Sequence, residues 1–135
     1  MREVLFRGKW TLLNEWLEGD LIQYSDAYQE IRDKKLGRQY PIDPSTGGQF
    51  SGLTDKNGKK IFEGDVVKYK NTDGIKFNGV ALTVIGKVVY NEKNASFAIS
   101  GKDEIGAKHY DYFPIKNIEI VGNIHDNPEL LEAKQ

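Results

Sequence analysis

Apolar and polar positions alternate with a period of two along most of this chain, in segments rich in β-branched and aromatic residues. Successive side chains of a strand point to opposite faces of its sheet, so this period favours strands over helices. The pattern predicts a mainly β protein with strands at Val4–Lys9, Trp16–Tyr24, Tyr28–Asp33, Gly48–Leu53, Ile61–Lys70, Leu82–Asn91, Ser96–Ser100, His109–Phe113 and Ile118–Gly122.

The segments between these strands have the composition of turns and loops. Asp55-Lys-Asn-Gly58 places a glycine where a hairpin must reverse, and Asn91-Glu-Lys-Asn94 is a second predicted hairpin. Residues 71–80 and 101–107 are rich in Gly, Asn, Asp and Lys, which predicts exposed, mobile loops. Gly86 lies in the middle of a long strand and predicts a bend or bulge of the kind that helps a small barrel to close.

The end of the chain has the pattern of a short helix. Asn127 suits an N-cap, Pro128 suits the first helical position, and Glu129 complements the positive end of the helix dipole. These residues predict a short C-terminal helix.

Two segments, Trp16–Tyr24 and Ile61–Tyr69, share the pattern Glu-Gly-Asp followed by two apolar residues and a tyrosine. We interpret them as two similar strand starts rather than a duplication. In this interpretation the glycines permit a tight entry, and Asp20 and Asp65 bond nearby backbone amides.

The composition is that of a folded globular protein, with 39% hydrophobic and 29% charged residues. No apolar run approaches the roughly 20 residues that cross a bilayer, and the first residues lack the apolar region of a signal peptide, so we expect a cytoplasmic protein without a membrane partner. The chain has no cysteine and therefore no disulfide or thiolate site. The net charge is −1, and no segment is strongly basic, which disfavours non-specific coating of nucleic acid.

Several motifs resemble those of the YopX family of phage and prophage proteins. Leu5-Phe-Arg-Gly-Lys9 is similar to the opening of the family, and Ile42-Asp-Pro-Ser-Thr-Gly-Gly-Gln-Phe-Ser-Gly-Leu53 to its central motif, with Gly47 where the family has valine. The Glu63-Gly-Asp65 step and the closing Gly122-Asn-Ile-His-Asp-Asn-Pro-Glu-Leu-Leu131 follow. The resemblance implies a β-rich protein with an SH3-type barrel in its C-terminal part. It implies no established activity and carries over no catalytic residue.

The length and the strand pattern together predict the domain organisation. We expect an N-terminal β subdomain at 1–52, an SH3-like barrel at 53–124 with the N-terminal strands packed on it, and a helical tail at 125–135. Separate cores much below about 60 residues bury too little surface to be stable alone, so we predict one cooperative unit.

No recognisable catalytic or metal-binding motif occurs. His109 and His125 lack the spacing of a metal site, and no Gly-x-Ser-x-Gly or phosphate-binding glycine motif is present. Glu63 and Asp65 are period-two neighbours, but a turn explains them more simply than an acid and base pair. The sequence therefore predicts a protein that is not an enzyme and has no cofactor.

The candidate binding residues lie on predicted strands of the C-terminal part. Alternation places Tyr110 and Tyr112 on one face, where the two rings either form a binding platform or cover the core with their hydroxyls in water. Aromatic rings beside Lys68, Lys70 or Lys87 could also stack on single-stranded nucleic acid.

These observations lead to a preferred hypothesis and two others. The preferred hypothesis is a non-enzymatic phage or prophage accessory protein that binds an unknown host or phage protein through its β surface. The alternative is a protein associated with nucleic acid in phage replication or expression, and the third is an enzyme of unrecognised type. Exposed strand edges also allow a homo-oligomer.

Overall fold

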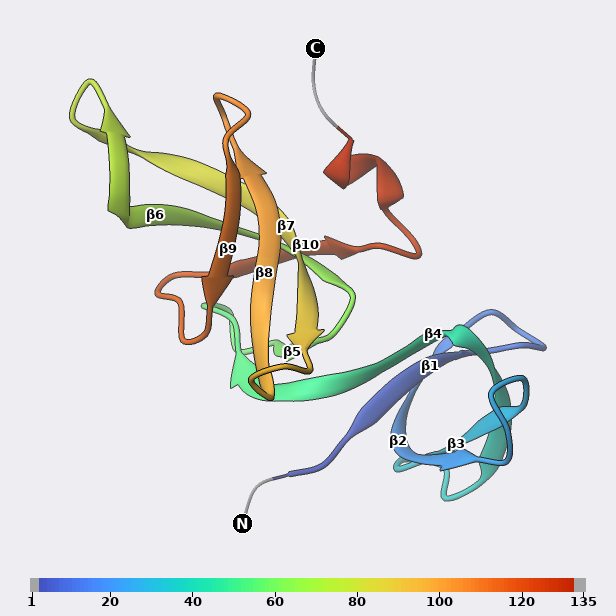
Figure 1. Ribbon diagram of the computed structural model, residues 1–135. Coiled ribbons are helices and arrows are strands. Elements are labelled where there is room, and N and C mark those ends of the chain that lie inside the picture. Colours follow the sequence, from blue (N-terminus) through green and yellow to red (C-terminus); the bar gives the residue numbers. More distant parts are fainter. Residues whose placement is uncertain (1–2, 133–135) are drawn as a thin grey trace. The chain divides into compact units, whose positions relative to one another are not determined.

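The chain forms ten β-strands and one short helical turn, in a computed structural model that describes residues 3–132 apart from the side chains of Asp73, Ile75 and Phe77 (Figure 1). The predicted mainly β class is confirmed. The chain divides into two compact units, Met1–Gly52 and Leu53–Gln135. The strands are β1 (Phe6–Trp10), β2 (Trp16–Gln23), β3 (Gln29–Asp33), β4 (Gln39–Thr54), β5 (Lys60–Phe62), β6 (Asp65–Phe77), β7 (Val80–Asn91), β8 (Ser96–Asp103), β9 (Lys108–Tyr112) and β10 (Glu119–Asn123).

The first unit is a small sheet that closes on itself. Strands β1 to β4 pair in sequence order, and β1 also pairs with β4, all antiparallel. Ile42 shows the closure, because it lies opposite Gln29 of β3 and also opposite Trp10 of β1. Its side chain is 2% exposed and packs with Leu17 and Ile31 in the core of this unit.

Strand β4 begins earlier than the predicted strand at Gly48–Leu53, so the predicted start of this strand was wrong. The Asp-Pro-Ser-Thr segment looks like a turn but forms an irregularity within the strand, where the pairing with β1 shifts between Arg7 and Lys9. The Thr46 hydroxyl accepts a hydrogen bond from the Lys9 backbone N–H at 2.9 Å. Side-chain bonds of this kind satisfy the backbone where the ladder is interrupted, so the strand continues through a turn-like sequence.

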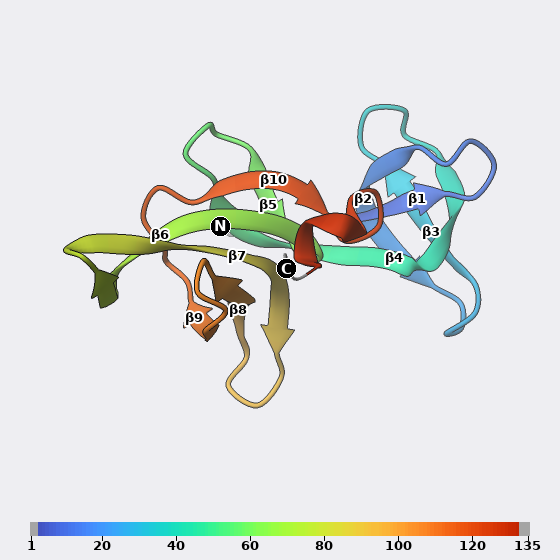
Figure 2. The same ribbon diagram turned by 90° about the horizontal axis from the view of Figure 1, so that it is seen from above.

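The second unit contains a five-stranded antiparallel sheet in the order β10-β6-β7-β8-β9 (Figure 2). Within β6 and β7 its core side chains come from alternate positions, as the period of two predicts. The core of the unit consists of Val67, Tyr69, Val84, Val88 and Ile99 of this sheet, with Ile61 of β5 and Ile118 just before β10.

The predicted loop at residues 71–80 was wrong, because β6 and β7 continue through it as a long hairpin. Asn78 and Gly79 form the turn with φ of 52° and 78°, the conformation of the two-residue turns that join twisted strands. The hairpin carries polar residues that resemble a loop in composition, so the Asn-Gly pair was the decisive signal. The second predicted turn, at 91–94, is confirmed between β7 and β8.

Gly86 was predicted to mark a bend or a bulge, and the bulge was wrong. The register of β7 with β8 is unbroken from Val84 to Asn91, and Gly86 lies opposite Gly101. A Cβ atom on Gly86 would lie 2.5 Å from the Ser100 carbonyl oxygen. The glycine therefore permits a close approach of two backbones rather than a bulge.

The predicted strand at Ile61–Lys70 is two strands, β5 and β6, because the chain turns at Gly64 with φ of 92°. The Asp65 carboxylate accepts a hydrogen bond from the Phe62 backbone N–H at 2.8 Å, as predicted for this residue. Gly19 has a different role, since it pairs within β2 and a Cβ atom there would lie 1.8 Å from the Arg32 carbonyl oxygen. The two Glu-Gly-Asp segments therefore have different structures.

The predicted C-terminal helix is only a 3-10 turn at Pro128–Leu131. The Asn127 side chain does not cap it but accepts a hydrogen bond from the Asn123 backbone N–H at 3.3 Å. One turn of four residues without a side-chain cap is too short to continue as an α-helix. The predicted tail extends to residues 133–135, which lie outside the described part. Within residues 3–132, no helix has the length and apolar character needed to span a bilayer.

The turn between β4 and β5 is organised by the buried carboxylate of Asp55, which is 6% exposed. One of its oxygens accepts hydrogen bonds from the backbone N–H groups of Asn57 and Lys59, both at 2.9 Å. The other accepts from the Ile120 N–H at 3.0 Å and thereby joins the turn to β10. Burial alone raises the pKa of Asp55, but the three N–H donors outweigh it and lower the pKa below its usual value.

Asp55→Asn should lower the free energy of unfolding by about 1–3 kcal/mol at pH 7. The side-chain NH2 group of asparagine would replace one carboxylate oxygen, and as a donor it cannot accept the backbone N–H hydrogen bond made there. The pKa of Asp55 is lowered on folding, so its contribution is present above the unfolded pKa of about 3.9 and is lost as the pH falls through the folded value. Urea unfolding should therefore show a smaller difference in stability between Asp55→Asn and the native protein at pH 3 than at pH 7. Asp26→Asn, at an exposed carboxylate, is the control and should leave the free energy of unfolding unchanged at both pH values. Equal stability of Asp55→Asn and the native protein at pH 7 would contradict this role.

Cooperativity can be tested because both tryptophans, Trp10 and Trp16, lie in the first unit. Ile99→Ala creates a cavity in the core of the second unit and should cost about 2–5 kcal/mol. If the chain is one cooperative unit, as expected from the small size of each part, the urea midpoint measured by tryptophan fluorescence should fall as well. The exposed substitution Ile105→Ala is the control. An unchanged fluorescence midpoint in Ile99→Ala would show independent unfolding.

Candidate binding groove

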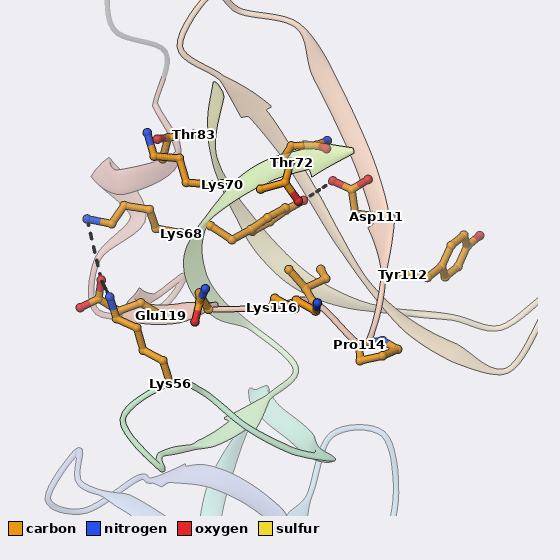
Figure 3. Close-up of a pocket in the computed structure, with 14 residues that line it drawn as sticks. Lys56, Lys68, Lys70, Thr72, Thr83, Asp111, Tyr112, Pro114, Lys116 and Glu119 are labelled. Carbon is orange, nitrogen blue, oxygen red and sulfur yellow. Dashed lines mark hydrogen bonds and ion pairs between the residues drawn. The ribbon is translucent and has the colours of Figure 1, made fainter. Parts of the chain in front are cut away.

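The second unit contains an open groove of about 700 Å³ along β6 and the connection from β9 to β10 (Figure 3). Its lining includes four lysines and two carboxylates: Lys56, Lys68, Lys70, Lys116, Asp111 and Glu119. The groove is therefore positively charged, although the whole chain has a net charge of −1.

Strand alternation places the lysines of β6 in this groove. Tyr69 points into the core, so its neighbours Lys68 and Lys70 are exposed on the opposite face. Glu119 lies opposite Lys68 on β10. Its carboxylate is 3.5 Å from the Lys56 amine and 3.8 Å from the Lys68 amine. These ion pairs are partly exposed and are readily screened by salt, so they leave the lysines available to an incoming anion.

The wall of the groove includes a hydrogen bond from the Tyr69 hydroxyl to the Asp111 carboxylate. Tyr69 is 4% exposed, so its hydroxyl has to be paired within the protein. Burial, and then the bond to Asp111, raise the pKa of Tyr69 well above its usual value. This hydroxyl therefore stays protonated and acts as a structural donor.

A second polar bridge lies beside the first and links β6 to β9 through His109. The Asn71 amide nitrogen is 3.0 Å from Nδ1 of His109, and Nε2 of the same ring is 2.8 Å from the Asp103 carboxylate. The bond to His109, with backbone N–H bonds from Ile105 and Ala107, lowers the pKa of Asp103 although burial opposes it. In the described part of the chain, no group of three or more His, Asp or Glu residues could hold a metal ion.

The two candidate tyrosines lie outside the core. Tyr110 and Tyr112 are 45% and 44% exposed, and their rings meet edge to face with centroids 5.4 Å apart. The Asn91 amide donates to both hydroxyls, at 3.1 and 3.3 Å. The two rings are therefore exposed and do not cover the core, and their role in binding stays a prediction.

The groove brings together Lys68, Lys70 and Tyr112, whose ring borders it and points outward in Figure 3. Tyr110 and Lys87 do not line it. The sequence analysis selected neither Lys56 nor Lys116 as a binding residue. The available signal for Lys116 was its position in the short turn before β10. Nothing in the sequence indicated that the turns carrying Lys56 and Lys116 meet the same stretch of β6.

The family model described as YopX protein matches residues 5–132, which is nearly the whole chain. A solved structure described as the crystal structure of protein EF1440 from Enterococcus faecalis is similar to it, at 22% sequence identity and a TM-score of 0.48. That alignment covers 98% of this chain and 100% of the other. No curated protein sequence matches the chain.

Tyr69→Phe should lower the free energy of unfolding by about 1–2 kcal/mol at pH 7, because the hydrogen bond to Asp111 is lost. The pKa of Tyr69 is raised on folding, so its stabilising contribution is present below about pH 10 and is lost as the pH rises further. The native protein should therefore lose more stability than Tyr69→Phe between pH 8 and pH 11 in urea unfolding. Tyr110→Phe, at an exposed hydroxyl, should follow the native curve. Parallel pH profiles of the native protein and Tyr69→Phe would contradict this assignment.

Proposed function

The chain belongs to the YopX family, and we propose that it is a non-enzymatic accessory protein of phage or prophage origin whose groove binds an acidic segment of a host or phage protein. In this proposal it acts in the cytoplasm of the bacterial host. The observation that carries the proposal is the set of four lysines around one open groove.

The charge distribution supports an acidic partner. The groove has four lysines against two carboxylates, while the chain as a whole has a net charge of −1. A local positive patch on a nearly neutral protein attracts a complementary segment and adds specificity and association rate more than affinity. Lysines also have long side chains that adapt to carboxylates at different positions.

The proposal includes an SH3-type barrel for the second unit. Five antiparallel strands in the order β10-β6-β7-β8-β9, with a short connection before β10, support this assignment. SH3-type barrels bind extended peptide segments in surface grooves, so this fold would suit the proposed function.

Two features support a binding function over catalysis. Tyr69 has a raised pKa, so its hydroxyl is a poor proton donor and a poor nucleophile near neutral pH. Both ring nitrogens of His109 already contact side chains, Asn71 and Asp103. These polar groups are occupied in linking strands to one another.

Binding of single-stranded nucleic acid is the second candidate, and the four lysines favour it. The two carboxylates in the lining repel any anionic ligand, so they do not distinguish nucleic acid from an acidic peptide. The aromatic residues of the lining fit it less well, since Tyr69 is buried and the Tyr112 ring points out of the groove in Figure 3. Stacking of bases requires exposed ring faces along the path of the strand.

The double substitution Lys68→Glu/Lys70→Glu should reduce recovery of the partner at least about tenfold when the tagged protein is captured from phage-carrying cells. It reverses two charges in the groove and places Glu at position 68 opposite Glu119, so the urea midpoint of the variant has to establish that it folds. Recovery of each bound protein can be measured by quantitative mass spectrometry, with and without nuclease.

The matched control is Lys87→Glu/Lys102→Glu, which makes the same charge change at exposed lysines of the same sheet outside the groove. A nuclease-resistant partner that the groove variant loses and the control retains is the expected result. Equal recovery with both variants would exclude the groove. Recovery that disappears with nuclease would favour the second candidate.

A further inference from the structure

Strand β9 forms a free edge of the second sheet. In the order β10-β6-β7-β8-β9, it pairs with β8 on one side, and no other strand of the described chain pairs with it. An edge of this kind presents backbone N–H and C=O groups to an added strand.

The hydrogen bonds flanking β9 show which residues face outward. The Phe113 N–H bonds the Phe97 carbonyl, and the Asp103 N–H bonds the Ala107 carbonyl, so odd-numbered residues of β9 exchange hydrogen bonds with β8. In an antiparallel pair, the residues that alternate with the hydrogen-bonded ones direct their N–H and C=O groups away from the partner strand. The outward residues are Lys108, Tyr110 and Tyr112.

The side chains of Tyr110 and Tyr112 along this edge are exposed, and each ring contacts the other. Tyr110 and Tyr112 form the edge-to-face pair whose hydroxyls are held by Asn91. An added strand would place its own side chains beside these rings, where aromatic and β-branched residues contact favourably across strands. The edge therefore offers both backbone groups and apolar contact area.

The lysine groove begins at the end of the same strand. Asp111 and Tyr112 belong to β9 and also line the groove, together with Lys70 and Lys116. A segment that leaves the edge of β9 at Tyr112 would therefore enter the positive groove.

Strands β6 and β9 are joined by side chains and have no backbone pairing with each other. The Tyr69–Asp111 and Asn71–His109 bridges connect them. Directly paired strands lie about 4.8 Å apart, and two side chains meeting end to end need a wider separation. Apart from these two side-chain bridges, no strand of the described chain is paired with this edge of β9.

We infer that the partner segment binds as an added strand on β9, with its backbone paired to Lys108, Tyr110 and Tyr112 and its carboxylates directed to the groove lysines. This inference rests on the proposed function and specifies the partner as an extended, acidic peptide. A second copy of the chain fits the edge less well, because it would bring Lys108 and the lysines of one groove against those of the other.

The probe is an acetylated peptide of about eight residues that alternates aspartate and valine, added to the full-length protein at low salt. Its twin carries the same side chains with every backbone nitrogen methylated, which prevents strand pairing. We expect the unmodified peptide to bind at least about tenfold more tightly than the twin. In NMR amide exchange, Lys108, Tyr110 and Tyr112 should become protected on binding, while His109 and Asp111 should change little because they already pair with β8.

Tyr110→Pro tests strand addition by changing the protein instead of the peptide. It removes an outward backbone N–H of β9 without breaking the pairing with β8. Its matched control, Tyr110→Val, removes the ring and keeps the N–H. The urea midpoints of both variants establish that they fold. Peptide affinity should be at least about tenfold lower in Tyr110→Pro than in Tyr110→Val.

The outcomes separate this inference from the proposed function. Equal binding of the peptide and its methylated twin, weakened by Lys68→Glu/Lys70→Glu, would overturn strand addition and leave the groove as a site for acidic segments. Binding of neither peptide would overturn the inference, and the cell capture would then decide the proposed function separately. Displacement of the bound peptide by oligothymidine would favour nucleic acid as the ligand.

Discussion

Burial of the Tyr69 hydroxyl is the constraint on which the second unit depends. An unpaired buried hydroxyl costs several kcal/mol, and here the partner comes from Asp111, 42 residues later in the chain. The bond fixes Asp111 on the inner face of β9, and alternation then places Tyr110 and Tyr112 on the outer face. The same rule on β6 exposes Lys68 and Lys70 on either side of Tyr69. This hydrogen bond and strand alternation together are consistent with the orientation of the side chains that form the groove and its rim.

Several carboxylates in this YopX family member hold the backbone at turns. Asp55 binds three N–H groups from a turn and from β10, Asp65 binds the Phe62 N–H, and Asp103 combines two backbone bonds with the bond to His109. Such bonds satisfy donors that the ladders leave unpaired at turns. The motifs Asp-Lys-Asn-Gly and Glu-Gly-Asp are therefore structural.

The strand pattern predicted most of the fold because a half-buried strand has to alternate. Its errors have identifiable causes. Polar residues at 71–80 belong to a hairpin that projects from the sheet, so composition alone suggested a loop. Gly86 faces Gly101 across two strands, and a single sequence does not show which glycines will meet. The ending of the chain has helical capping residues, yet the Asn127 side chain bonds the Asn123 backbone instead.

The sequence by itself determined the β class and the two hairpin turns at 55–58 and 91–94, which depend on local alternation and turn chemistry, and its motifs identified the family. It placed the two tyrosines on one face of a strand, but only the structure decided that this face is exposed. The tertiary structure decided which residues share a site. Lys56, Lys116 and Glu119 reach the lysines of β6 only because β10 pairs with β6 and two turns lie beside it. The partners of Tyr69 and His109 were decided in the same way. Contacts between distant segments follow from sheet order and register, and these are properties of the packed molecule as a whole.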